Sequence, residues 1–375
     1  MTQPPRKAAA PPKTGLIGAF AEFWRGFVTP SLFAFGLTMT IFIIGAVLVV
    51  TMITPAFLAG PAGSYLPRST RDSEAFVTRE ALRLAQPIPA SDTRQRIYIL
   101  GDSATAHAFA SVKGVEDAIG AATGKPVVAG FLTTPLQRSL DEARLADYAT
   151  RGRAGTVVFG VSFDHYGLTP EYLLQLDRLE RLGLRSPWAS RDILQLGGRP
   201  RRLFGNYMID NRGFLLRDLR AMIGRMVLRK SATRRIDVYT RVPPATPAYI
   251  AAERVSELRT LRAFSPSTDV SVTLLGDTVG RLKARGNRIL FVEIPVDDAM
   301  FETPEDIQRY TDYLAWSKAL ASRLGGDYCR LADYDKPPPS AYADLVHIVD
   351  PAIQAQLRQA LAKCVAAMGI SGKTA

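Results

Sequence analysis

Residues 96–103, RIYILGDS, decide how the fold of this chain is interpreted. The first five are a short apolar run rich in β-forming residues, and Gly101 ends this run just before Ser103. A helical pattern over residues 104–112 follows at once. A buried strand that leads directly into a helix is typical of a parallel α/β sheet. Ser103 is therefore expected at the carboxyl edge of such a sheet, where these folds bind their ligands.

The alternation of strand and helix patterns continues along the chain. Further strands are predicted at residues 127–129, ended by Gly130; 156–159, ended by Gly160; 289–294, ended by Pro295; and 328–331. Helices are predicted at residues 135–150 and 303–324, and from Asp350-Pro351 to Met368 with Gly369 as the stop. Together these patterns predict a three-layer α/β domain with a parallel sheet over residues 92–370.

An insertion is predicted between the third and fourth strands, at about residues 165–250. About 125 residues separate those strands, far more than one crossover needs. We expect helix around residues 214–230 and a proline-rich turn at 242–244. Residues 178–241 hold 16 Lys and Arg against 5 Asp and Glu, so they carry +11 of the chain's net charge of +12.

The N-terminal part of the chain predicts a membrane anchor. No charged residue occurs between Arg25 and Arg68, and residues 32–58 supply the roughly 20 apolar residues that a membrane-spanning helix needs. The tail, residues 1–31, is basic, so the positive-inside rule keeps it in the cytoplasm and exports the rest. Within it, residues 15–28 are either an interfacial helix or a simple extension. Residues 59–91 are expected to be a linker.

This topology changes what the positive charge implies. A basic chain usually indicates nucleic acid or an anionic surface. Because the basic insertion is expected outside the cytoplasm, we expect no nucleic acid. An anionic glycan, a lipid headgroup or an acidic partner fits the insertion better, and a solvated basic surface without a ligand remains an equal alternative.

A second motif completes the chemistry that Ser103 needs. A serine hydroxyl is a poor nucleophile unless a base activates it and a third group orients that base. Asp344-Leu345-Val346-His347 places an acid and an imidazole three residues apart, just before the last predicted helix. The carboxylate of Asp344 can hold His347 in the tautomer that accepts the serine proton.

With Gly101-Asp102-Ser103 and Asp344-Leu345-Val346-His347 in these places, the chain resembles the SGNH (GDSL) hydrolase superfamily over about residues 92–370. The resemblance implies a flavodoxin-like three-layer fold, with Ser103 as nucleophile, His347 as base and Asp344 as its partner. It also implies an oxyanion hole formed by Ser103, Gly130 and the residue at position 162. Ser162 stands where the family has asparagine, and this favours a slow transferase over a fast hydrolase.

The anchor and the altered third block resemble one subgroup in particular. Its members work with membrane-bound O-acyltransferases in alginate acetylation and in teichoic acid D-alanylation. The resemblance implies a single-pass protein of the bacterial inner membrane with an extracytoplasmic domain and a polytopic O-acyltransferase as its partner. The implied activity is O-acylation, chiefly O-acetylation, of an envelope polysaccharide or glycolipid. An esterase and a non-catalytic scaffold are the alternatives.

The remaining candidate residues each have a structural alternative. Asp102 either contacts substrate or caps the following helix, and His107, one turn after Ser103, either lines the pocket or packs in the core. Asp164 and His165 follow the third strand and either position an acyl acceptor or serve the fold.

The cysteines and the metal-ligand patterns limit the chemistry further. Cys329 and Cys364 are expected on neighbouring elements, and the sequence leaves open whether they form a disulfide or remain buried thiols. No zinc spacing, HExxH motif or phosphate-binding loop occurs in the sequence, so no metal and no cofactor are predicted.

Overall fold

The computed structural model describes residues 18, 32–54, 56–57, 60, 73–134, 137, 139–166, 206–210, 212, 224, 226–228, 245–265 and 270–371. The chain divides into two units, Met1–Met52 and Ile53–Ala375. The first unit contains helix α2, Leu32–Met52. Its residues Ala34–Met52, with a mean hydropathy of 2.3, make α2 long and apolar enough to cross a membrane.

The helix of this first unit is shorter than the predicted anchor. The sequence predicted an apolar segment over residues 32–58, but α2 ends at Met52, and residues 53 and 54 are not helical. The predicted interfacial helix at 15–28 lies outside the described residues, apart from residue 18.

The second unit is built on five parallel strands in the order β2-β1-β3-β4-β5. The strands are β1 Gln95–Leu100, β2 Val127–Phe131, β3 Thr156–Val161, β4 Arg288–Glu293 and β5 Asp327–Arg330. The chain moves outward from β1 to β2 on one side and to β3 on the other. The carboxyl ends of β1 and β3 are therefore the switch point where a doubly wound sheet opens a crevice. The predicted α/β class with a parallel sheet is confirmed.

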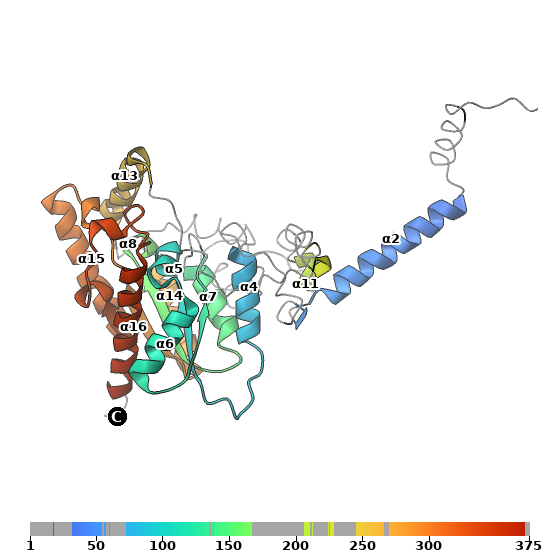
Figure 1. Ribbon diagram of the computed structural model, residues 1–375, viewed down its shortest axis with the longest axis horizontal. Coiled ribbons are helices and arrows are strands. Elements are labelled where there is room, and N and C mark those ends of the chain that lie inside the picture. Colours follow the sequence, from blue (N-terminus) through green and yellow to red (C-terminus); the bar gives the residue numbers. More distant parts are fainter. Residues whose placement is uncertain are drawn as a thin grey trace, which may run out of the picture. The chain divides into compact units, whose positions relative to one another are not determined.

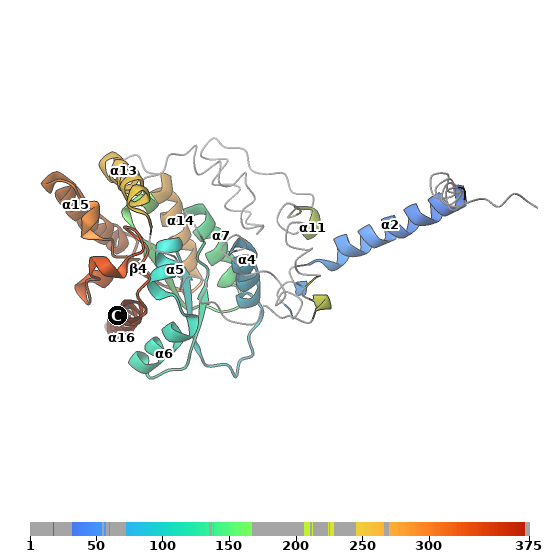
Figure 2. The same cartoon turned by 45° about the horizontal axis from the view of Figure 1, so that its top comes forward.

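Helices cover both faces of this sheet (Figures 1 and 2). On one face lie α6 Val112–Thr123 and α16 Pro351–Ser371. The other face is covered by α4 Ser73–Leu84, α7 Ser139–Ala149, α14 Val270–Ala284 and α15 Pro304–Arg323. The short helices α5 Ser103–Phe109 and α8 Phe163–Tyr166 follow β1 and β3, α11 spans Tyr207–Asp210, and α13 spans Pro247–Ala263.

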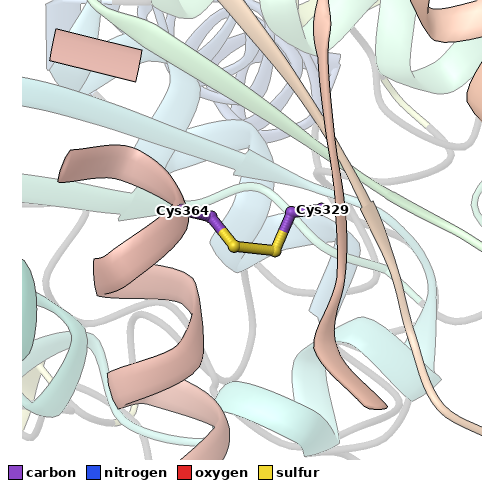
Figure 3. The surroundings of a disulfide bond; sticks show 2 residues. All are labelled: Cys329 and Cys364. Atoms are coloured by element: carbon purple, nitrogen blue, oxygen red, sulfur yellow. A yellow bond between two sulfur atoms is a disulfide. The ribbon is translucent and has the colours of Figure 1, made fainter. Parts of the chain in front are cut away.

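The core beneath α6 and α16 is apolar and closed by a disulfide. Strand residues such as Ile97 and Ile99 pack there against Ile119 of α6 and Leu361 of α16. Cys329 of β5 and Cys364 of α16 form a disulfide with a Cα–Cα distance of 6.1 Å (Figure 3). The structure thus resolves what the sequence left open, and it joins the last strand to the last helix.

Several predicted boundaries were wrong. The expected linker at 59–91 contains α4, which packs against α7 and β2, so the folded unit begins before residue 92. The helix predicted over 104–112 is two helices, α5 and α6, separated at Ala110, where the backbone has a φ of 50°. The last helix does begin at the predicted Asp350 cap but continues past Gly369 to Ser371.

The glycines that were expected to end two strands lie inside them. β2 extends beyond Gly130 to Phe131, and β3 extends beyond Gly160 to Val161. Most of the predicted insertion, including the proline-rich turn and nearly all of the expected helix at 214–230, lies outside the described residues.

Candidate active site

The end of β1 places Ser103 at the carboxyl edge of the sheet. After Leu100 the chain turns through Gly101, whose φ of 142° disfavours any residue with a side chain. Asp102 then caps α5 by accepting the backbone N–H of Thr105 at 3.2 Å. Ser103 is the first residue of this helix, and its side chain is partly exposed beside the crevice.

Two glycines make room for the first turn of α5. Thr105 is fully buried, and a methyl group added at Gly101 or at Gly160 would overlap its side chain. Glycine at these positions therefore lets α5 sit directly on the ends of β1 and β3. This close packing fixes the height of Ser103 above the sheet.

The loop before α16 places the acid and the base. Asp344 Oδ1 accepts the backbone N–H groups of Val346 at 2.9 Å and of His347 at 2.7 Å. The Ala343 N–H donates to the His347 carbonyl at 2.9 Å and closes the loop. The carboxylate is thus held by the backbone of the segment that carries the imidazole.

Ser103, His347 and Asp344 form one chain of hydrogen bonds. His347 Nε2 lies 2.8 Å from Ser103 Oγ, and His347 Nδ1 lies 2.6 Å from Asp344 Oδ2. Because an ionised carboxylate only accepts hydrogen bonds, Nδ1 donates to it and Nε2 is left to accept the serine proton. The two sequence motifs, which lie at opposite ends of the domain, therefore meet in the geometry of a nucleophile, its base and an orienting acid.

The electrostatics of the pair suit proton transfer. Burial lowers the pKa of His347, but the hydrogen bond and charge of Asp344 outweigh burial, and the net pKa is raised above its ordinary value. Burial raises the pKa of Asp344, yet the His347 ring and two backbone N–H groups overcome this and lower it. Asp344 therefore stays ionised while His347 gains basicity.

His107 lies against this base. Its ring centroid is 4.8 Å from that of His347, and the two rings meet edge to face. Burial, followed by the neighbouring His347, lowers the pKa of His107 to about 3, so His107 is neutral at pH 7. Gln354 of α16 donates to the carbonyls of His107 and of Ile348, both at 2.9 Å, and so ties α5 to the loop of the base.

A cavity of about 180 Å³ opens at Ser103. It is lined by Asp102, Ser103, Ala104, Ser162, Phe163, Tyr249, Glu253, Glu257, Ile294, Pro295, Val296, Val346 and His347. Ser162, which was predicted for the oxyanion hole, therefore shares the cavity with the nucleophile. Asp102 also reaches it, although its observed contact is the helix cap.

Gly130 is not brought to this cavity. It lies within β2 opposite Tyr98, and an added methyl group there would overlap Leu84 of α4. Gly130 is thus not among the residues that line the cavity at Ser103. Its lack of a side chain lets α4 pack closely on the edge of the sheet.

His165 also lies outside the cavity. Its Nε2 is 3.0 Å from Glu142 Oε2 of α7, and both side chains are buried. The structural alternative for His165 is thus the one observed. The side chain of Asp164 lies outside the described part of the structure.

Helix α13 brings residues to the cavity that were missed from the sequence. Tyr249, Glu253 and Glu257 follow one another at intervals of four residues and line the same wall. Glu253, Asp344 and His347 each offer a donor atom within 4.8 Å of the others, close enough for a shared metal ion. However, both oxygens of Asp344 and both nitrogens of His347 already take part in hydrogen bonds.

No protein-family model matches the chain, and no curated protein matches it. The geometry around Ser103 is therefore the basis for assigning a function.

Proposed function

We propose that this protein is a membrane-anchored serine acyltransferase with an SGNH-like domain. The observation that carries the proposal is the hydrogen-bonded chain Ser103–His347–Asp344 at the switch point of a parallel sheet. A serine that is bonded to an imidazole, which is in turn oriented by a carboxylate, is the arrangement that activates a hydroxyl as a nucleophile.

The residues account for both halves of acyl transfer. Ser103 Oγ forms a bond to the acyl carbonyl carbon while its proton passes to His347 Nε2. The tetrahedral intermediate then expels the donor's leaving oxygen, which takes that proton. In the second half, a hydroxyl of the acceptor attacks the acyl-serine and gives its proton to His347. Release of the product returns the proton to Ser103 Oγ.

The size of the cavity supports a short acyl group. Its volume of about 180 Å³ falls below the roughly 300–1,000 Å³ of sites that enclose a drug-sized ligand. We therefore propose acetyl or a similarly small group as the one transferred. Helix α2 supports action at a membrane, where we propose a polytopic O-acyltransferase as the acyl-supplying partner and an envelope glycan or glycolipid as the acceptor.

Hydrolysis is the second candidate, because the same residues serve it with water as acceptor. The side chain of His347 is 20% exposed, so solvent reaches the base. An esterase of envelope polymers would differ from the transferase only in how the acyl-serine is resolved.

The proposal is tested by covalent labelling of the full-length protein in detergent with a fluorophosphonate. We expect Ser103 to be labelled and the Ser103→Ala variant to remain unlabelled. Failure of the wild type to label, under conditions in which an authentic serine esterase reacts, would overturn the catalytic assignment. Acetyl release from 4-nitrophenyl acetate is then compared with and without oligosaccharide. Release that never yields acetylated oligosaccharide would favour the esterase.

A further inference from the structure

We propose that Glu253 binds a second hydroxyl group of the acyl acceptor, beside the hydroxyl that attacks the acyl-serine. The site would thereby select acceptors with neighbouring hydroxyls, as carbohydrates have. This inference rests on the proposed acyl transfer at Ser103 and adds the residue that distinguishes a glycan from a simple alcohol or water.

Helix α13 holds Glu253 in a fixed position at the site. At its start, Thr246 caps the helix through the Tyr249 N–H, and the Ala245 N–H donates to the Ala343 carbonyl at 2.8 Å. Ala343 directly precedes Asp344, so the helix is bonded to the loop of the catalytic acid.

The far end of α13 is held by an ion pair. The Arg262 guanidinium binds both carboxylate oxygens of Asp306, the first-turn acid of α15, at 2.8 Å each. A bidentate pair of this kind fixes orientation as well as distance. With both ends attached, α13 presents Glu253 to the cavity from a rigid element.

The carboxyl group of Glu253 has one oxygen to spare. The Leu345 backbone N–H is close enough to this carboxyl to stabilise its ionised form. Oε2 is buried, and it has no hydrogen-bond partner among the residues that the structure describes. A buried polar atom without a partner is costly, and a ligand hydroxyl would satisfy it.

The position of Glu253 matches a neighbouring hydroxyl. One of its oxygens lies within 4.8 Å of a carboxylate oxygen of Asp344 and of a ring nitrogen of His347. The attacking hydroxyl of an acceptor must approach His347 Nε2, and adjacent hydroxyls of a sugar are separated by about one hydrogen-bond length. A single sugar ring can therefore present one hydroxyl to His347 and the next to Glu253.

The protonation behaviour of Glu253 agrees with this role. Burial, followed by the charge of Asp344, raises its pKa, whereas His347 and the Leu345 N–H oppose the rise. In its protonated form a carboxyl group can both donate to and accept from a hydroxyl group, and a raised pKa extends that form to higher pH. Glu253 is thus better suited to binding an uncharged polyol than to binding a cation.

The test compares two acyl acceptors, one with neighbouring hydroxyl groups and one with a single hydroxyl group. The full-length protein in detergent is acetylated with 4-nitrophenyl acetate, and the acetyl group is partitioned between water, 1-propanol and methyl α-D-glucopyranoside. We expect the wild type to prefer the glucoside to 1-propanol. Glu253→Ala, which removes both oxygens, should lower transfer to the glucoside about tenfold or more relative to 1-propanol, the effect of losing one hydrogen bond to an ionisable group.

A matched variant and a conservative one keep the result interpretable. Glu305→Ala removes an exposed carboxylate at the start of α15 and should leave the glucoside-to-propanol ratio unchanged. If Glu253→Ala does not fold, as judged by its thermal unfolding, Glu253→Asp retains the carboxyl at shorter reach and should show the same shift in the ratio.

The outcomes separate this inference from the proposed function. If the wild type is not acetylated at Ser103, the proposed function fails and this inference fails with it. If the wild type is acetylated but shows no preference for the glucoside, only the role of Glu253 is overturned. The same holds if the Glu253 variants lower transfer to both acceptors equally, because that result indicates a general structural effect.

Discussion

Replacing Asp344 by asparagine tests the site most directly, because it changes the chemistry while preserving the loop. The amide oxygen of Asn can still accept the N–H groups of Val346 and His347, which now bond Oδ1 at 2.9 and 2.7 Å. The amide NH₂ would then face His347 Nδ1, which accepts its hydrogen bond and moves the ring proton to Nε2. In that tautomer Nε2 cannot take the proton of Ser103.

The expected loss in the rate of Ser103 acylation follows from two effects. Losing the charged hydrogen bond of 2.6 Å to Nδ1 costs about 1.5–3 kcal/mol. The wrong tautomer adds to this, and the same replacement in a serine protease lowers kcat by about 10⁴-fold. We therefore expect a loss of about 10⁴-fold, or about 5.5 kcal/mol of transition-state stabilisation.

The assay is the rate of fluorophosphonate labelling of Ser103, with thermal unfolding as the check on folding. Asp350→Asn is the matched control, because Asp350 also accepts backbone N–H groups, at the start of α16, and asparagine caps helices equally well. It should label at the wild-type rate. Labelling of Asp344→Asn within tenfold of the wild-type rate would contradict this role of Asp344.

Three further predictions concern pH, the disulfide and the packing under the site. Because the pKa of His347 is raised above 6.5, its imidazole is mostly unprotonated only above that raised value. The rate of Ser103 labelling should therefore increase with pH through a midpoint above 6.5, and a midpoint at or below 6.5 contradicts this. Replacing Cys329 and Cys364 by alanine opens a link of sequence separation 35 and should lower the free energy of unfolding by about 4 kcal/mol in denaturant titrations. Gly160→Ala should lower the free energy of unfolding by about 1–3 kcal/mol and slow the labelling of Ser103. At Gly280 an added methyl group would have no neighbouring atom within 4 Å, so Gly280→Ala should leave the free energy of unfolding unchanged or raise it.

The parts of the site that could be predicted from sequence are those coded by short local patterns. The apolar run that ends at Gly101 predicted β1 and the turn to Ser103 correctly. The spacing of Asp344 and His347 predicted their contact, because three residues in a loop bring an acid against an imidazole. These contacts depend on a few adjacent residues and on the edge of the sheet at which they emerge.

The glycines were misread because local sequence does not show what packs against them. Both Gly130 and Gly160 were taken as strand ends, since glycine is a common breaker. Each instead lies within a strand and leaves room for a side chain, Leu84 in one case and Thr105 in the other. Those partners come from separate helices, so the need for glycine becomes visible only in the assembled domain. Gly130, which was predicted for the oxyanion hole, accordingly lies within β2 and not in the lining of the cavity at Ser103.

Glu253 was missed because α13 departs from the usual pattern of an amphipathic helix. Such a helix buries its apolar residues and exposes its charged ones. Here Val255 is 56% exposed, whereas Glu253 is half-buried with an oxygen that has no described partner. The hydrogen bond from the Ala245 N–H to the Ala343 carbonyl joins the start of this helix to the loop of the site, and no local pattern encodes that contact. Departures from the pattern are expected where a side chain binds a ligand, because its contribution is to the free energy of binding and not to the free energy of folding. The orientation of α13 is thus an argument for a functional Glu253, because packing alone would favour the opposite choice.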